Sequence, residues 1–334
     1  MGTKCSALCN DSKKDKNDSV PEYQPGPGPQ TGNGNRGFQQ QMVAPASSAM
    51  PDGSVPQEQA AHTDRSSVTV NYFERELSEL NKLPSQTGGD VEWRPPYQFQ
   101  SGASYTGQWK GNKRHGWGKM TWPDGATYEG EWNENKAEGK GHFVHFDGDI
   151  YIGEWRDNVA HGHGTYLHKN STSYSGQWKN DVQEGYGVET WGEGSRYEGS
   201  FKAGKKEGYG VYYWSDESEY HGEWHSNKIN GVGLYKGKDA RLFRGEWRNS
   251  VMHGMGNYEW ADGRRYAGYY AEDRKEGFGI FYWSDGRRYE GFWKEGKQHG
   301  QGRYFLKNGT SKMAEWDMGH RLRWIPEGEG KEAA

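Results

Sequence analysis

The sequence predicts an all-β protein, an elongated antiparallel solenoid of β-hairpin repeats with a disordered N-terminal tail. Three observations support this fold class. A Tyr-x-Gly-x-Trp block or a close variant returns every 23 residues between Ser104 and Trp316, and each of the nine full copies is followed by a Gly-x-Gly. Only 31% of the chain is hydrophobic, yet it holds 16 Trp, 22 Tyr and 11 Phe. A fixed period of this length marks a repeat array whose units bury their apolar faces against one another.

Residues 1–65 are predicted to form a disordered tail, because few apolar groups are present to offset the entropy of ordering. The first residues match the N-myristoylation pattern at Gly2, and the two cysteines of the chain, Cys5 and Cys9, lie beside it. One acyl chain binds a membrane only weakly, so palmitate on Cys5 or Cys9 would supply the second anchor. We therefore expect a myristoylated and palmitoylated tail that tethers the chain to a membrane; an unmodified tail is the alternative.

Residues 66–95 lead into the array and are predicted to include a short amphipathic helix. Phe73, Leu77 and Leu80 follow the spacing of one helical face, and Pro84 ends the pattern. We expect this helix to cover the open N-terminal edge of the array, because an unpaired strand edge needs a cover. A helix that docks a partner is the alternative.

Residues 96–316 form the array, and each repeat is predicted to be a β-hairpin. In the first strand, aromatic and glycine positions alternate with polar ones, as around Glu129 and Glu131. The second strand opens with Gly-x-Gly and places aromatic residues two and four positions later. Asp-Gly pairs such as Asp124-Gly125 then supply the turn into the next repeat. Glycine is required where aromatic rings lie over its missing side chain.

This pattern of Tyr-x-Gly-x-Trp and Gly-x-Gly over residues 105–316 resembles the MORN (membrane occupation and recognition nexus) repeat family. The sequence departs from the motif at Glu189 and Gly237, where aromatic residues are expected, and at Ala314, which replaces a glycine. The resemblance implies an antiparallel solenoid with one hairpin per repeat and a scaffolding or targeting role. It also implies that such arrays pair through their C-terminal repeats.

One face of the eighth and ninth repeats is predicted to be an interaction surface for a protein partner or for a second copy of the chain. The first repeat places Thr, Gln and Lys on this face, whereas the later repeats place apolar residues there, namely Tyr269, Ile280, Tyr282, Phe292 and Phe305. An apolar patch of this size usually marks a partner site. Alternatively, the C-terminal tail, residues 317–334, folds back over the patch through Leu322, Trp324 and Ile325.

Other classes of site are not expected. The net charge of −4 gives no reason to expect a nucleic-acid partner. No apolar run is long enough to span a membrane, and the N-terminus lacks the apolar region of a signal peptide. No arrangement of residues indicates a catalytic site, a cofactor site or a metal site.

The histidines are interpreted as structural. Those that precede the first glycine of a Gly-x-Gly are expected to be turn residues with local hydrogen bonds: His115, His161, His253 and His299. A second group lies in neighbouring repeats: His142, His145, His161, His163 and His168. Equivalent positions one repeat apart are two strands, or about 9.6 Å, apart, which is too far for two of them to share one Zn²⁺.

The expected function is a non-enzymatic scaffold at the cytoplasmic face of a membrane, where it would organise a cortical, junctional or ciliary assembly. This follows from the predicted tether together with the family resemblance. Two alternatives remain open: a phospholipid-binding regulatory module, for example of a phosphatidylinositol phosphate kinase, and a radial-spoke component of a cilium. The first alternative requires a basic stripe along one face, whereas the basic residues are scattered among nearly equal numbers of acids.

Overall fold

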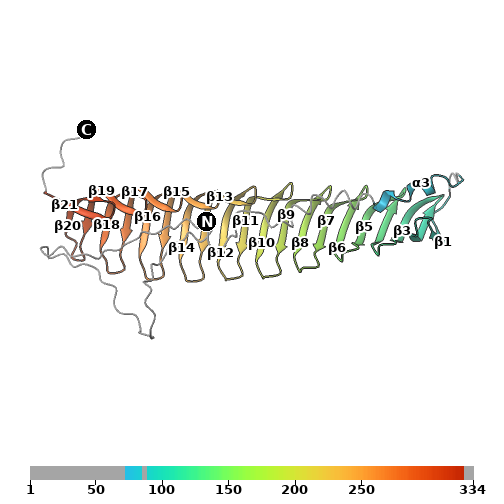
Figure 1. Ribbon diagram of the computed structural model, residues 1–334, viewed down its shortest axis with the longest axis horizontal. Coiled ribbons are helices and arrows are strands. Elements are labelled where there is room, and N and C mark those ends of the chain that lie inside the picture. Colours follow the sequence, from blue (N-terminus) through green and yellow to red (C-terminus); the bar gives the residue numbers. More distant parts are fainter. Residues whose placement is uncertain (1–71, 85–88, 327–334) are drawn as a thin grey trace, which may run out of the picture. The chain divides into compact units, whose positions relative to one another are not determined.

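The computed structural model describes residues 72–84 and 89–326, and this part of the chain is almost entirely β-strand. The strands form one open antiparallel sheet of 21 strands, in which strands that follow one another in sequence pair with each other (Figure 1). The chain divides into two compact units, and the division falls between Gly233 and Leu234. The predicted fold class, an all-β array of antiparallel hairpins, is confirmed.

The first unit holds one short helix, α3 (Leu77–Leu80), and the following strands: β1 (Glu92–Gln98), β2 (Ser104–Lys110), β3 (Lys113–Thr121), β4 (Thr127–Asn133), β5 (Lys136–Val144), β6 (Ile150–Arg156), β7 (Val159–Leu167), β8 (Ser173–Lys179), β9 (Val182–Thr190), β10 (Arg196–Lys202), β11 (Lys205–Tyr213) and β12 (Glu219–His225). The division falls within β13 (Lys228–Lys236). The second unit continues with β14 (Leu242–Arg248), β15 (Val251–Glu259), β16 (Arg265–Ala271), β17 (Arg274–Tyr282), β18 (Arg288–Lys294), β19 (Lys297–Phe305), β20 (Ser311–Asp317) and β21 (His320–Ile325).

The turn inside each hairpin also links neighbouring repeats. Between β4 and β5, Glu134 and Asn135 have φ angles of 52° and 73°, which a two-residue hairpin turn of this kind requires. The Asn135 side-chain oxygen accepts a hydrogen bond of 2.8 Å from the backbone N–H of Arg114, one repeat earlier. The side chain that favours the turn therefore also fixes the distance between two hairpins.

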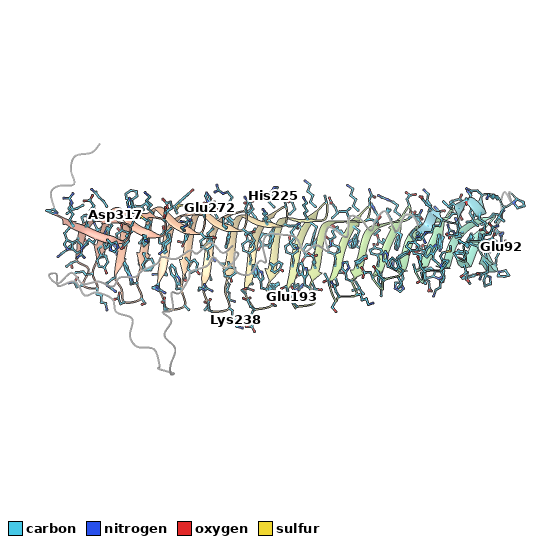
Figure 2. All side chains as sticks on the ribbon, in the orientation of Figure 1. Glu92, Glu193, His225, Lys238, Glu272 and Asp317 are labelled. Carbon is cyan, nitrogen blue, oxygen red and sulfur yellow. The ribbon has the colours of Figure 1, made fainter. Side chains whose placement is uncertain are left out.

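The turn between repeats lies at the other edge of the sheet. In the turn at Asp124-Gly125, Gly125 has a φ of 94° and an Asp124 oxygen accepts the N–H of Ala126 at 3.1 Å. Within the first unit, Glu193 in a turn between repeats lies at the edge opposite His225, which ends β12 beside a hairpin turn (Figure 2). Within the second unit, Lys238 lies at the edge opposite Glu272 in the same way (Figure 2).

Aromatic rings stacked over glycines form the core of each repeat. The Tyr128 ring lies over Gly141, where an added Cβ would be 2.5 Å from the ring, and its hydroxyl donates to the Glu131 carbonyl at 2.9 Å. Trp132 meets the edge of Tyr128 with ring centroids 5.0 Å apart, and Trp155 of the next repeat meets it at 5.3 Å. Each tyrosine thus joins two successive repeats, which explains why the block needs Tyr, Gly and Trp at alternate positions.

One departure from the repeat motif is compensated inside the core. Glu189 takes an aromatic position on β9, and its carboxylate pairs with the Lys206 amine at 2.7 Å. Both side chains are buried. The amine also lies 4.7 Å from the centroid of the Trp191 ring and 5.1 Å from that of Tyr197, a favourable geometry for a cation. Two polar residues from neighbouring repeats, on β9 and β11, therefore satisfy each other.

The helical segment before the array packs on the aromatic face of the sheet, not on its edge. The Phe73 ring lies 5.1 Å from Tyr128 and 5.5 Å from Trp155 between ring centroids. The buried Arg114 guanidinium donates to the Phe73 carbonyl at 3.2 Å. The prediction that this helix covers the open N-terminal edge of the array was therefore wrong, because the segment packs on the aromatic face instead. The aromatic face in this region has room for two further rings, Tyr72 and Phe73, and their burial decides where the segment docks.

The sheet has two strands more than the repeats alone predict. At the N-terminal edge, β1 pairs with β2, and it begins within the predicted lead-in and runs past its end at residue 95. At the C-terminal edge, β21 pairs with β20, so that Ala314 lies opposite Trp324 and Met313 opposite Ile325. The start of the predicted C-terminal tail is therefore an edge strand and does not fold back over the eighth and ninth repeats.

Candidate interaction surface

The side chains that alternate with the core aromatics form the opposite side of the sheet, which we call the outer face. The middle residue of each Gly-x-Gly lies on this face. In six of the nine repeats it is a large apolar or aromatic residue with an exposed side chain: Trp117, Tyr186, Tyr209, Val232, Met255 and Phe278. The other three repeats place Lys140, His163 and Gln301 there. An exposed apolar residue therefore recurs at one defined position of the repeat.

A β-bulge makes this position special. In the first repeat the pairing shifts between Gly107 and Trp109, so that Gln108 faces a loop of the second strand. The Gln108 side-chain oxygen accepts the N–H of Trp117 at 2.7 Å. The same bond forms in four other repeats: Lys140 to Glu131 at 3.0 Å, Tyr186 to Gln177 at 3.1 Å, Val232 to Glu223 at 3.3 Å and Met255 to Glu246 at 3.1 Å. A Glu or Gln at the fourth position of the block thus holds the bulge.

In two of the later repeats, an aromatic residue replaces the Glu or Gln that accepts this hydrogen bond. Tyr269 on β16 lies opposite Met255, and Phe292 on β18 lies opposite Phe278. The Phe278 and Phe292 ring centroids are 5.8 Å apart, and the two side chains remain 54% and 51% exposed. We call Met255, Tyr269, Phe278 and Phe292 the C-terminal aromatic cluster. It lies on four neighbouring strands, β15 to β18.

The other predicted surface residues lie on the same face but are better covered. Ile280, Tyr282 and Phe305 are each partly buried. The Arg265 guanidinium lies 5.1 Å from the Tyr282 ring centroid, and that of Arg288 lies 3.7 Å from the Phe305 ring centroid. These arginines shield the rings from solvent and place positive charge beside the cluster.

Sequence reasoning missed two members of the cluster, Met255 and Phe278. Both occupy the middle position of a Gly-x-Gly, which was predicted only to open the second strand of each repeat. The signal was present in the sequence, because Tyr186, Tyr209 and Val232 are also apolar at this position. Alternation with the buried Tyr258 and Phe281 places Met255 and Phe278 on the outer face.

A family profile described as the MORN repeat matches nine successive segments of the chain: residues 105–127, 128–150, 151–173, 174–196, 197–219, 220–239, 243–264, 266–287 and 289–311. The chain belongs to the MORN repeat family. MORN repeats are found in proteins that act at membranes or in protein interactions, and this chain is a repeat protein of that broad kind. In the part of the chain that the structure describes, no helix is both long and apolar enough to cross a bilayer.

Comparisons with whole proteins add little to this assignment. No curated protein matches the sequence. Among solved structures, the TCP10 domain of Danio rerio CPAP is 12% identical, with 62% of this chain and 98% of that domain covered and a TM-score of 0.36. A virginiamycin B lyase from Staphylococcus aureus is 12% identical, with coverages of 70% and 89% and a TM-score of 0.14. Similarities this low carry no argument about the fold or function of the MORN array.

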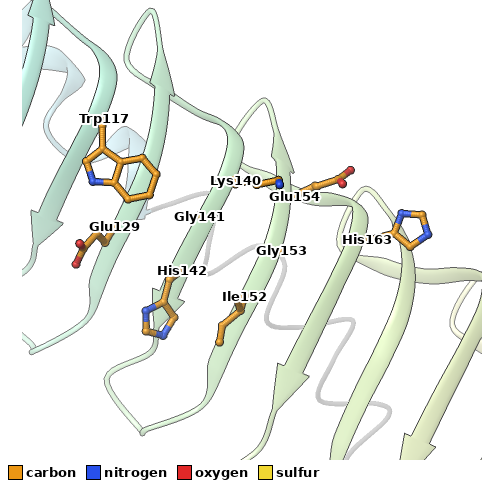
Figure 3. A pocket seen from close by; sticks show the side chains of 9 residues that line it. All are labelled: Trp117, Glu129, Lys140, Gly141, His142, Ile152, Gly153, Glu154 and His163. Carbon is orange, nitrogen blue, oxygen red and sulfur yellow. The ribbon is translucent and has the colours of Figure 1, made fainter.

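The outer face of the first unit has a shallow groove of about 430 Å³ between β3 and β7 (Figure 3). Trp117 and Ile152 supply its apolar surface, and His142 and His163 lie along it (Figure 3). Among the described residues, His, Cys, Asp and Glu form no group of three or more suited to hold a metal ion. Within the same unit, His168 instead turns to the core side and meets the buried Asp149 carboxylate at 2.9 Å.

The histidines that precede Gly-x-Gly do not make the predicted local hydrogen bonds through Nδ1. In His115, His161, His253 and His299 this atom is buried without a hydrogen-bond partner. In two of them a carboxylate of the next hairpin turn lies nearby, at 3.4 Å for His253 with Glu272 and 3.3 Å for His299 with Asp317.

The predicted lipidation residues, Gly2, Cys5 and Cys9, lie outside the described residues.

Proposed function

We infer that this chain is a non-enzymatic scaffold, tethered to the cytoplasmic face of a membrane by its acylated N-terminus, whose array binds protein through the outer face. The C-terminal aromatic cluster is the observation that carries this inference. Tyr269 and Phe292 replace the Glu or Gln that holds the bulge in five other repeats. The exchange removes a hydrogen bond worth about 0.5–1.5 kcal/mol and exposes an aromatic ring at each site. The stability of the fold alone therefore does not favour Tyr or Phe in place of Glu or Gln at these two sites.

The occupant that we propose for the cluster is a second copy of the chain. A two-fold contact would bury the same cluster on both copies, so one set of aromatic substitutions serves both sides. Arg265 and Arg288 border the cluster. Glu259 lies opposite Arg265 on β15, and Glu290 pairs with Arg288 on β18 at 2.7 Å. Opposite charges at the rim would fix the register of the two copies. A contact of roughly 800 Å² per copy is the size expected of a stable interface.

The membrane tether rests on the sequence alone. Gly2 matches the myristoylation pattern, Cys5 and Cys9 offer palmitoylation sites, and Lys13 and Lys14 follow them. Two anchors together with a basic segment are sufficient for stable attachment. A tethered array would present its outer face to cortical, junctional or ciliary partners at the membrane.

The observations favour this function over a phospholipid-binding module. In the turns of the second unit, arginine follows aspartate by two residues, and the two side chains pair. Arg241 meets Asp239 at 2.7 Å, and Arg264 meets Asp262 at 2.7 Å. Arg287 meets Asp285 at 2.8 Å. Such internal pairing leaves less positive charge for phosphate groups than a free basic stripe would.

Membrane fractionation of cells that express the full chain tests the tether. We expect the wild-type chain in the membrane fraction and Gly2→Ala in the soluble fraction, because the substitution removes the myristoylation site. The pair Cys5→Ser and Cys9→Ser should weaken retention without abolishing the first, transient attachment. A Gly2→Ala chain that stays in the membrane fraction would disprove the acyl tether.

A further inference from the structure

We propose that a slot on the outer face of the fourth and fifth repeats binds a polyproline-II segment of a partner protein. Two tyrosines form the walls of the slot: Tyr186 on β9 and Tyr209 on β11, which are 53% and 61% exposed. Ser200 on β10 lies between them as the floor. It is directly opposite Tyr186 in the pairing of β9 with β10. The whole slot lies within the first unit.

The small floor distinguishes this place from the other repeats of the array. The fourth position of the block holds Gln, Glu, Tyr or Phe in every other full repeat, and serine only at Ser200. Its side chain is too short to reach the bulge, since an added Cβ on Gly208 would still be 3.7 Å from Ser200 Cβ and 3.9 Å from its hydroxyl. The space that a Glu or Gln side chain fills in other repeats is therefore not filled by Ser200 between the exposed rings of Tyr186 and Tyr209.

The missing side chain also changes the hydrogen bonding of the bulge. In five repeats a Glu or Gln oxygen accepts the N–H of the residue that corresponds to Tyr209, as Gln177 does for Tyr186 at 3.1 Å. Ser200 is too short for that role, so the bulge of this repeat lacks the side-chain acceptor that those five repeats have. A ligand carbonyl at this point would restore the bond that the other repeats make internally.

Two valines flank the slot beyond Ser200, with Glu198 between them, and a hydrogen bond holds the Tyr186 wall. Val188 on β9 and Val211 on β11 each lie opposite Glu198 on β10. The Tyr186 hydroxyl donates to Glu198, which also pairs with the Arg196 guanidinium. These bonds hold the Tyr186 ring in place before a ligand arrives, which lowers the entropy lost on binding.

The spacing of the exposed residues matches a polyproline-II helix. Equivalent residues of successive repeats are two strands apart, which is roughly 9.4–9.8 Å. A polyproline-II helix has three residues per turn and rises about 3.1 Å per residue, so its side chains repeat every ~9.3 Å. Tyr186, Tyr209 and Val232 occupy the equivalent position in three successive repeats. A proline-rich segment that runs across the strands would therefore meet one of them at every third residue.

Aromatic-lined clefts are the usual binding sites for polyproline-II segments, because the rigid ligand loses little entropy and packs its prolines against the rings. The charges near the slot favour a basic flank on the ligand. Glu223 lies opposite Tyr209 on β12 and is exposed. We therefore assign the slot to segments with proline at every third position and an arginine or lysine at one end.

The test is fluorescence anisotropy of a labelled peptide, Arg-Pro-Leu-Pro-Pro-Leu-Pro-Pro-Leu-Pro, titrated with the full chain. A second peptide replaces every proline with alanine. We expect the proline peptide to bind and the alanine peptide to bind at least tenfold more weakly. No binding of the proline peptide at millimolar protein, or equal binding of both peptides, would overturn the proposal.

Ser200→Gln is the decisive variant. It restores the residue type found at Gln177, so we expect it to hold the bulge and to leave the melting temperature unchanged or higher. Because the longer side chain fills the slot, it should weaken peptide binding at least tenfold. Trp117→Ser, which changes the equivalent outer position of the first repeat, is the matched control and should leave binding unchanged. Wild-type affinity in Ser200→Gln would contradict the slot. This result is independent of the C-terminal aromatic cluster, which lies in the other unit.

Discussion

The glycine in each Tyr-x-Gly-x-Trp block is required by contact distance rather than by backbone conformation. A Cβ on Gly153 would lie 2.5 Å from the Gly164 Cα, 2.6 Å from the Tyr151 hydroxyl oxygen and 2.7 Å from the His163 carbonyl oxygen. Two of these neighbours are backbone atoms of the paired strand, so the obstruction cannot be relieved by a change of rotamer. These contacts explain why the repeat tolerates many changes at its polar positions but few at this glycine.

Gly153→Val should lower the free energy of unfolding by about 2–3 kcal/mol, through overpacking and displacement of the Tyr151 ring. Glu154→Ala, at the adjacent outer position, should change it by no more than about 0.5 kcal/mol, because Glu154 is not one of the five Glu and Gln residues that accept a bulge N–H. Urea unfolding followed by tryptophan fluorescence measures both. Equal unfolding midpoints for the two variants would mean that the inner and outer faces have been assigned the wrong way round.

A second residue-scale effect concerns the side chain that links successive hairpin turns. Asn158 accepts the N–H of Ala137 at 2.7 Å, and in the next repeat Asp181 accepts that of Ala160 at 2.6 Å. Burial raises the pKa of the Asp181 carboxyl to about 6, and the bond to Ala160 only partly opposes this. The folded state therefore favours the protonated acid. Its contribution to stability is complete below about pH 4 and is lost as the pH rises through 6.

Asp181→Asn should therefore stabilise the array at pH 7, where the wild-type carboxylate is ionised in a buried site. We expect a gain of about 1–2 kcal/mol, which shrinks below pH 5. Asn158→Asp is the reciprocal control and should destabilise the array at pH 7. Thermal unfolding at pH 7.5 and pH 4.5 measures the effect. A gain for Asp181→Asn that is the same at both pH values would show that ionisation is not its cause.

At the scale of structural elements, the buried pair of Glu189 and Lys206 joins β9 to β11 across β10. Removing one partner leaves an uncompensated buried charge, which typically costs about 3–5 kcal/mol, whereas replacing both with apolar residues is often neutral or stabilising. Earlier repeats show which residues fit these two positions, since Tyr166 occupies the first position two strands earlier and Ala160 occupies the second position four strands earlier.

Glu189→Tyr alone and Lys206→Ala alone should each destabilise the fourth and fifth repeats, and the double variant should recover most of the loss. Urea unfolding of the four chains gives the coupling energy of the pair. Single-variant losses that simply add in the double variant would mean that the two charges do not depend on each other.

The elements also show how far the sequence alone could predict this fold. The period of 23 residues and the alternation of aromatic and polar residues were enough to predict every hairpin of the array, because each repeat packs only on its neighbours. Strands β1 and β21 lack the motif and were missed, since pairing with an existing edge, not local sequence, makes them strands. The docking of Phe73 on the aromatic face was likewise hidden, because it depends on the space left between rings of different repeats.

The candidate surface could be predicted only in part, because it also depends on contacts between strands that the local sequence does not show. Tyr269 and Phe292 stand out as aromatic residues at positions that are polar elsewhere in the array. Met255 and Phe278 join them through the regular pairing of β15 with β16 and of β17 with β18, a partner register that the alternation within one strand does not give. The exposed fraction of Tyr282 is reduced by Arg265, a contact between neighbouring strands that alternation alone does not show.

At the scale of the whole molecule, the chain combines an N-terminal segment that matches the myristoylation pattern with a repeat array that exposes an aromatic cluster in its second unit. We propose that this cluster on the outer face is a protein-binding surface that pairs two copies. Phe278 and Phe292 are its most exposed adjacent rings, and neither is needed for the aromatic core of a repeat. Their replacement should therefore remove the interface and leave the fold intact.

The most direct test is the mass of the full, unacylated chain by light scattering coupled to gel filtration, over a range of concentrations. We expect the wild-type chain to reach about twice its 38.0 kDa mass. The double variant Phe278→Ser with Phe292→Ser should stay at the monomer mass with an unchanged circular dichroism spectrum. The control variant Trp117→Ser should still dimerise. A wild-type chain that remains monomeric at high concentration, or a double variant that dimerises as well as the wild type, would contradict the claim.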